Sequence, residues 1–277
     1  MPNPVFNEES FKAASQNQNG WGAPQAGTHV APVPITDGPV SSWQKAMTIN
    51  GTISASAVLL LILLASAAFG WNAAEGPTTT LENGQQVDTY QFPALGFLGI
   101  VIGFIAVIVA MRKPALAKYL GPVYAIGYGF AVGAISKGYE TFYNGIVLQA
   151  VLATASVFGV MLVLYRTRII KVTDKFRRAV IFATLGVMVL YLGSFIFSLF
   201  GGSLPFLNGD NMALSIAFSV FVCGLAAMNL ALDFDFIERA TNSGMPKEYE
   251  WVAALGLVVT LVWLYLEILR LLSYLRN

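Results

Sequence analysis

The sequence predicts an all-α integral membrane protein with seven transmembrane helices. Hydrophobic residues make up 56% of the 277 positions and charged residues only 11%, which is about half the charge of an ordinary soluble domain. The apolar residues gather in runs of about 20, the length that crosses the hydrocarbon core of a bilayer. Such runs must be helices in lipid, because each segment has to satisfy its own backbone hydrogen bonds. We therefore expect one compact membrane bundle.

Residues 1–45 differ from the rest of the chain in composition. Asn, Gln, Ser, Gly and Pro dominate this part, as in the stretch from Ser15 to Gly20. A segment of this kind buries too little apolar surface to offset the entropy of ordering it. We expect a disordered cytoplasmic tail at 1–45 and a seven-helix transmembrane domain at 46–277. No signal peptide is expected, since the first apolar run starts only near Ile49.

The apolar runs place the seven spans in order along the chain. They lie at about 46–70, 92–111, 122–135, 145–165, 179–200, 212–232 and 251–272. A loop is expected between the first two spans. Small residues are expected to let the third and fourth spans approach each other closely: Gly127, Gly129, Gly133, Ala153 and Ala155.

The positions of the basic residues predict the orientation. With a cytoplasmic N-terminus, one side of the membrane carries Lys12, Lys45, Arg112, Lys113, Lys118, Arg166, Arg168, Lys171, Lys175, Arg177, Arg178, Arg239 and Lys247. The loops between spans on the other side keep only Lys137. Cytoplasmic segments of membrane proteins are enriched in Lys and Arg, so we expect the N-terminus inside and, after seven spans, the C-terminus outside.

Several classes of function are excluded by composition. A net charge of +1 gives no bulk field for recruiting nucleic acid. Cys223 is the only cysteine and His29, in the tail, the only histidine, so a cysteine cage, a zinc-binding histidine pair and a Ser-His-Asp triad are all unavailable. We expect a protein that is not an enzyme and has no cofactor.

Two groups of ionisable residues lie within or at the ends of spans, where charge is costly unless it faces a cavity or a partner. Asp233, Asp235 and Glu238 close the sixth span, and they are either a solvated helix end or acids turned toward a cavity. Glu267 and Arg270 lie in the seventh span, where the i, i+3 spacing also allows a local pair. The basic stretch at 166–178 is open to two interpretations as well, a topology determinant or a surface for anionic lipid.

Four segments give the chain a resemblance to a known family. They are Gly145–Ala150 leading to Thr154 and Phe158, the basic turn Thr167–Lys175, the run Asp233–Ile237, and the last helix Ala254–Leu272. In these the chain resembles the bacterial branch of the Bax inhibitor-1 (transmembrane Bax inhibitor motif) family whose members have long N-terminal tails. The resemblance implies six helices around a central seventh, a bacterial plasma-membrane location, and a cation leak, mainly of calcium, whose gate responds to pH.

In that family two aspartates that share a proton hold the gate, and the sequence matches only the first of them. Asp233 fits, since Ile237 follows it four residues later as in the family pattern. For the second position, one register places Glu267 there and an ungapped register places Thr260 there. We prefer Thr260, which lies about 13 Å beyond Trp251 along a helix, whereas Glu267 lies about 24 Å beyond it.

The resemblance and the positions of the ionisable residues on their helices together give the expected roles of the site residues. Asp233 and Thr260 are expected to form the pH sensor or gate, and Glu267 and Asp235 the pore or cation sites. Arg112 and Arg270 are the expected charge partners. Calcium prefers several hard oxygen ligands, so only weak binding is expected at Asp233 and Glu267, which leaves no firm metal site. Thr260 and Glu267 share a face of their helix, since seven residues are nearly two turns.

The leading functional prediction is a pH-sensitive cation leak or ion-homeostasis protein, with membrane lipid and calcium or other cations as partners. The alternative is a non-conducting adaptor that regulates a membrane protease or another membrane partner through the tail and the basic turn. Acids that face a continuous polar cavity would favour conduction, and acids that face solvent would favour the adaptor.

Overall fold

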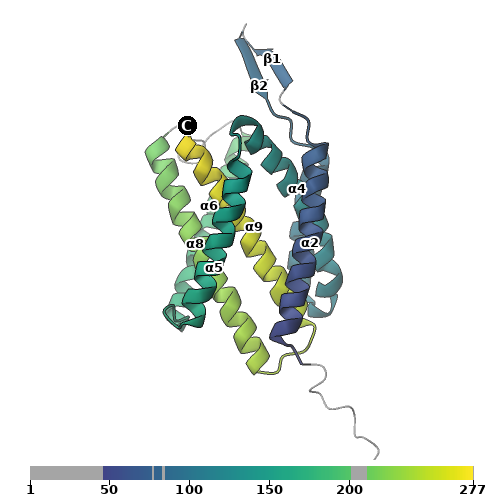
Figure 1. The fold of residues 1–277 in the computed structure, drawn as a ribbon, viewed down its shortest axis with the longest axis vertical. Coiled ribbons are helices and arrows are strands. Elements are labelled where there is room, and N and C mark those ends of the chain that lie inside the picture. Colours follow the sequence, from purple (N-terminus) through teal and green to yellow (C-terminus); the bar gives the residue numbers. More distant parts are fainter. Residues whose placement is uncertain (1–45, 77, 83–84, 201–210, 277) are drawn as a thin grey trace, which may run out of the picture. The chain divides into compact units, whose positions relative to one another are not determined.

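The computed structural model describes residues 46–76, 78–82, 85–200 and 211–276. The disordered tail predicted at 1–45 lies outside these residues. Within them the chain forms long helices, shown in Figure 1. Their bounds are α2 Ile49–Ala73, α3 Ala94–Arg112, α4 Ala117–Phe142, α5 Ile146–Arg166, α6 Asp174–Leu199, α8 Met212–Asn242 and α9 Tyr249–Arg276, with a short 3₁₀ helix at Pro114–Leu116.

Six of these helices are long and apolar enough to cross a membrane, which makes the chain a multi-pass membrane protein. The prediction of a helical membrane protein is confirmed to that extent. The exception among the described helices is α4, in which glycines, tyrosines, a serine and two lysines dilute the apolar residues. It is nevertheless 26 residues long, nearly twice the length expected from the apolar stretch at 122–135.

Local sequence signals explain where several helices begin. The side chains of Thr48, Thr173 and Asn211 each accept a hydrogen bond from a backbone amide in the first turn of α2, α6 and α8, as N-cap residues do. Gly145 and Gly244 have positive φ angles of 77° and 65°. Glycine adopts this conformation without strain, so these two residues allow the tight connections before α5 and after α8.

The connection between α2 and α3 differs from the expected loop. It contains a two-stranded antiparallel hairpin, β1 Thr78–Glu82 and β2 Gln85–Thr89, in which Thr78 pairs with Thr89 (Figure 1). Three consecutive threonines in β1 favour extended backbone. The bundle itself is all helical as predicted, and the hairpin is an addition in this connection. The hydroxyl of Tyr90, just after β2, donates to Ala134 O of α4 at 2.6 Å, and burial raises the pKa of Tyr90, so this phenol remains a donor.

The small residues of α4 pack against α2 and α3. A Cβ added to Gly133 would overlap the carbonyl of Ala67 in α2, and one added to Gly127 would overlap Gly99 in α3. The expectation that Gly127 and Gly133 would bring the third and fourth spans together was wrong about the partner. Small residues allow close approach to any neighbour, and the main neighbours of α4 are α2 and α3.

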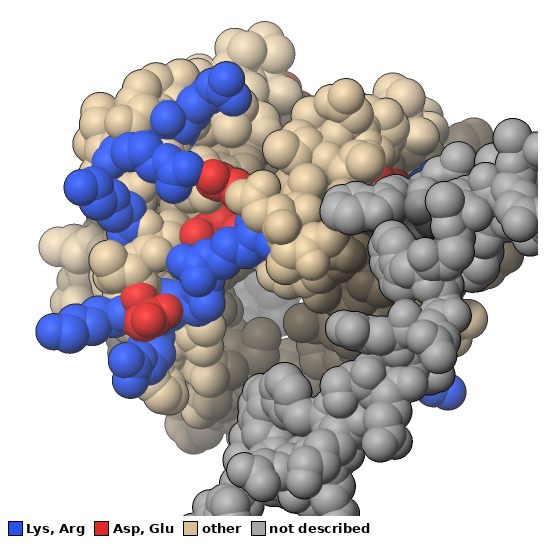
Figure 2. Space-filling view, turned by 90° about the horizontal axis from the view of Figure 1, so that it is seen from below, with Lys and Arg blue, Asp and Glu red and all other residues tan. Residues whose placement is uncertain are grey.

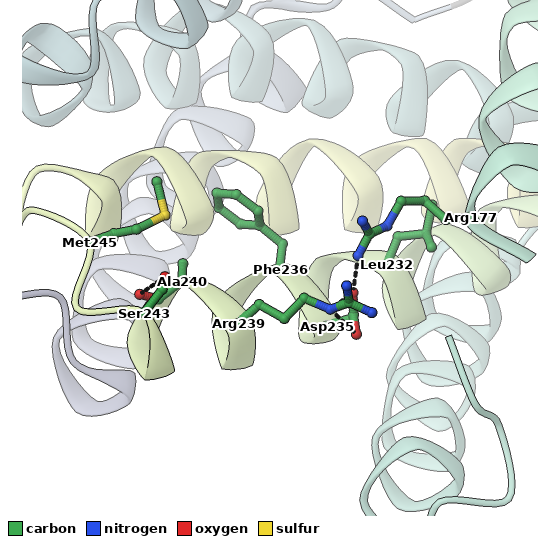
Figure 3. Close-up of a pocket in the computed structure, with 8 residues that line it drawn as sticks. All are labelled: Arg177, Leu232, Asp235, Phe236, Arg239, Ala240, Ser243 and Met245. Carbon is green, nitrogen blue, oxygen red and sulfur yellow. Dashed lines mark hydrogen bonds and ion pairs between the residues drawn. The ribbon is translucent and has the colours of Figure 1, made fainter. Parts of the chain in front are cut away.

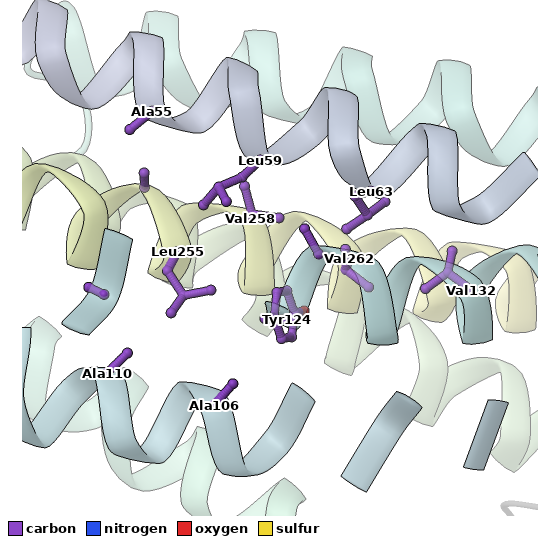
Figure 4. Close-up of a cluster of buried hydrophobic side chains, with 13 residues drawn as sticks. Ala55, Leu59, Leu63, Ala106, Ala110, Tyr124, Val132, Leu255, Val258 and Val262 are labelled. Carbon is purple, nitrogen blue, oxygen red and sulfur yellow. The ribbon is translucent and has the colours of Figure 1, made fainter. Parts of the chain in front are cut away.

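α9 contributes to the two largest apolar clusters of the bundle. With α2, α3 and α4 it forms a core that includes Leu59, Tyr124 and Val258 (Figure 4). With α5 and α8 it forms a second core that includes Leu230 and Leu264. Buried residues make up 56% of the apolar span of α9, against 11% for α6, which packs mainly on α8.

The connections α3–α4, α5–α6 and α8–α9 lie at one end of the bundle, together with the start of α2. We call it the basic end, because it carries Arg112, Lys113, Lys118, Arg166, Arg168, Lys171, Lys175, Arg177, Arg178, Arg239 and Lys247. Figure 2 views this end and shows blue side chains gathered around a few acidic ones. At the opposite end, Arg276 near the C-terminus donates to Asn144 O at 2.8 Å.

Candidate functional site

Asp233 lies on α8 against α9, inside the bundle. Its Oδ2 is buried and has no hydrogen-bond partner among the described residues. A Cβ added to Gly256 of α9 would stand 3.7 Å from Asp233 Oδ1, so Gly256 faces this carboxylate. Thr260, one turn further along α9, faces the same carboxylate, and its hydroxyl donates to Gly256 O at 3.1 Å. The structure therefore brings Asp233 and Thr260 together.

Glu267 occupies a separate site further along α9. Its Oε1 lies 2.6 Å from Nη2 of Arg270, and its Oε2 accepts from the hydroxyl of Tyr191 in α6 at 2.9 Å. Arg270 also donates to Tyr191 at 2.7 Å and to Ser219 of α8 at 3.3 Å. Glu267 is only 4% exposed. The local pair that the i, i+3 spacing allowed is present, and it is buried and shared by three helices.

An apolar layer separates these two polar sites. On α8, Val222 and Leu225 lie between Ser219 and Asp233 in the chain, and both are fully buried or nearly so, at 0% and 1% exposure. They pack with Trp263, which lies between Thr260 and Glu267 on α9. The Asp233 and Glu267 carboxylates therefore do not share one polar space.

Asp235 and Glu238 turn away from α9 toward the basic turn between α5 and α6. Asp235 is 7% exposed and lies 2.6 Å from Arg177 Nη2 and 2.9 Å from Arg239 Nε. Glu238 forms a salt bridge of 2.6 Å with Arg168 and accepts from the hydroxyl of Tyr165. α8 continues to Asn242 instead of ending near the last apolar residue, so these two acids form ion pairs along the helix and are not a bare helix end.

The remaining predicted site residues are less engaged. Arg112 is exposed at the end of α3 and takes part in none of the four salt bridges that the described residues form. The same residues contain no cluster of three or more His, Cys, Asp or Glu that could hold a metal ion. Calcium at Asp233 or Glu267 would therefore have to draw its other ligands from hydroxyls, carbonyls and water.

Two buried or capping acids were missed in the sequence. Glu250, 4% exposed, accepts from both the backbone amide and the hydroxyl of Thr48 at 2.9 Å and so ties the start of α2 to α9. Glu140 accepts from the amides of Gly145 and Val147 at 2.6 and 3.1 Å and caps α5. An acid in the first turn of a helix, as Glu250 is, was the available signal, because acids favour helix N-termini.

Comparison with known proteins identifies the family. No curated protein matches the chain. The family model described as Bax inhibitor 1 like matches residues 3–277, which is essentially the whole sequence and includes every helix described above. This chain belongs to the Bax inhibitor 1 like family.

Proposed function

We propose that the protein is a pH-sensitive cation leak, chiefly for calcium, that contributes to ion homeostasis in a bacterial plasma membrane. The observation that carries this proposal is the carboxylate of Asp233 beside Gly256 and Thr260, whose buried Oδ2 finds no partner in the described part of the chain. A buried polar atom without a partner is costly. A proton or a cation bound at Asp233 would supply that partner, and this links the site to both pH and ions.

The proposed membrane arrangement has all seven helices crossing, with α9 in the centre. α4 has 26 residues, about 39 Å of helix at 1.5 Å per residue, which is long enough to span the hydrocarbon core. The central place of α9 is supported by its contacts with α2, α4, α5 and α8. The excess of Lys and Arg at the basic end supports a cytoplasmic N-terminus and an external C-terminus.

The structure corresponds in this proposal to a closed state. The apolar layer of Val222, Leu225 and Trp263 would have to part before an ion moves between Asp233 and Glu267. Arg270 holds the Glu267 carboxylate, so its guanidinium takes the place that a permeating cation would occupy. Conduction through Glu267 therefore requires Arg270 to move, and Asp233 is the residue at which an entering cation would first be held.

Calcium flux into vesicles tests this function. The purified protein is reconstituted into liposomes that contain a calcium indicator, and flux is followed at acidic, neutral and alkaline pH. We expect a flux that changes with pH and is absent from protein-free vesicles. The exposed acid Asp174 at the same end supplies the control variant Asp174→Asn, which should behave as the parent. Flux that is absent at every pH would contradict the leak function.

A second function is favoured by the pairing of the other acids. Asp235 and Glu238 are held by Arg177, Arg239 and Arg168 at the basic end, which is an arrangement suited to a surface. This function is that of a non-conducting adaptor, which regulates a membrane protease or another membrane partner through the basic end. Such an adaptor would bind its partner even if the protein carries no calcium flux.

A further inference from the structure

A pocket opens at the basic end between α6 and α8. Its volume is about 390 Å³, within the range of small-ligand sites. Figure 3 shows Arg177 reaching from α6 and Arg239 from α8 toward Asp235 on one side of this pocket. Phe236 and Met245 supply apolar lining. The pocket thus combines two guanidinium groups with an apolar wall.

The charges of the pocket do not cancel. Arg177 and Arg239 share the single carboxylate of Asp235, which leaves one positive charge over. A guanidinium has five N–H donors, of which Arg177 gives one to Asp235, and Arg239 gives its Nε–H to Asp235 and one more to Val172 O at 3.2 Å. The side chains are 37% and 52% exposed, so donors remain for a ligand.

The remaining donors suit a phosphate. Arginine binds phosphate oxygens through two parallel hydrogen bonds, and a phosphodiester carries one negative charge, which matches the surplus in the pocket. Other Lys and Arg side chains of the basic end make the surrounding surface positive (Figure 2), but they do not line the pocket. Positive surface charge attracts anionic lipid to this end in general, and the two arginines of the pocket supply the hydrogen bonds.

The surroundings of the pocket suit an acyl chain. Phe236 is 39% exposed, and Ile181, one turn beyond Arg177 on the same face of α6, is 44% exposed. α6 is the least buried of the candidate spans, so an apolar surface begins directly beside the two arginines. A lipid with a charged head group and a hydrocarbon chain fits both the arginine pocket and the apolar surface beside it, whereas a free phosphate fits only the arginine pocket.

We propose that the pocket formed by Arg177 and Arg239 binds the phosphodiester head group of an anionic phospholipid, whose chains lie along α6. This site is independent of the leak proposed at Asp233. The carboxylate of Asp235 holds the two guanidinium groups in place and competes with the lipid for their donors.

Lipid binding to the full chain tests the site. The protein in detergent is titrated with phosphatidylglycerol or phosphatidylcholine, and bound lipid is counted by native mass spectrometry. We expect a preference for phosphatidylglycerol that falls about tenfold in Arg177→Gln and in Arg239→Gln, the effect of losing about 1.4 kcal/mol of charge-assisted hydrogen bonding. Arg178→Gln removes the same charge from the next residue, which does not line the pocket, and should retain the preference.

A further variant separates ligand binding from a structural role. Asp235→Asn frees donors on both arginines, so it should strengthen binding of phosphatidylglycerol. If the arginines served only to hold the fold together through Asp235, the same change would weaken lipid binding. Equal losses in all three arginine variants would overturn the proposal in favour of diffuse surface charge. Displacement of the lipid by millimolar inorganic phosphate would overturn it in favour of a free-phosphate site.

Discussion

The guanidinium of Arg270 lies 2.6 Å from the carboxylate of Glu267 within α9, and the hydroxyl of Tyr191 from α6 contacts both groups. Arg270 also lies over the Tyr191 ring, with its Cζ 5.1 Å from the ring centre. Each charge is therefore compensated inside the bundle. This pair makes α6 part of the polar centre of the protein, although α6 has few other buried contacts.

Removal of one member of this pair should destabilise the protein more than removal of both. Arg270→Gln leaves a buried carboxylate without its counter-charge, which costs about 3–5 kcal/mol. The double variant Glu267→Gln, Arg270→Gln leaves two neutral amides and should recover most of that loss. Thermal unfolding in detergent, measured for both single variants and the double variant, checks this. Additive effects of the two substitutions would contradict the account.

The contact between Glu250 and Thr48 should also contribute to stability. Glu250→Ala removes the acceptor of two Thr48 donors, and we expect a loss of about 1–3 kcal/mol. Glu248 is exposed two residues earlier, so Glu248→Ala should change the stability by less than about 0.5 kcal/mol. The midpoint of thermal unfolding, measured for each variant, gives the two changes in stability. Equal midpoints for the two variants would show that this contact does not hold α2 to α9.

Close packing of α2 on α4 predicts a third effect. Gly133→Ala adds a methyl group that would overlap the carbonyl of Ala67, and overpacking of this kind costs about 1–3 kcal/mol. Gly159 of α5 has open space at the same position, so Gly159→Ala should be neutral or stabilising by up to about 1 kcal/mol, the difference in helix propensity. The two variants are compared by thermal unfolding. A stable Gly133→Ala protein would require α2 and α4 to lie further apart.

Hydropathy predicted the positions of the long apolar helices. The apolar runs coincide with the cores of the long helices that the structure describes, because apolar composition is what burial in lipid requires. They fail where helix formation does not depend on apolar side chains. The part of α8 from Asp233 to Asn242 is rich in charged residues yet helical, and the full length of α4 is hidden by its glycines and tyrosines.

The candidate site was predicted in part, for a related reason. Asp233 and Glu267 stand out because acids are rare in apolar spans. Thr260 was paired with Asp233 only through the register of the family resemblance, and the structure brings these two residues together. The partners that come from other helices, Tyr191 for Glu267 and Arg177 for Asp235, follow from tertiary packing. No local pattern in the sequence specifies which helices lie side by side.

The pH response of calcium flux in Asp233→Asn tests the central claim most directly. Asparagine has nearly the shape of aspartate but does not titrate, so it removes the group that would respond to protons beside Thr260. In the liposome assay, with Asp174→Asn as the control, we expect Asp233→Asn to give a calcium flux that no longer changes with pH. A variant whose flux keeps the pH dependence of the parent protein would contradict the assignment of Asp233 as the gate.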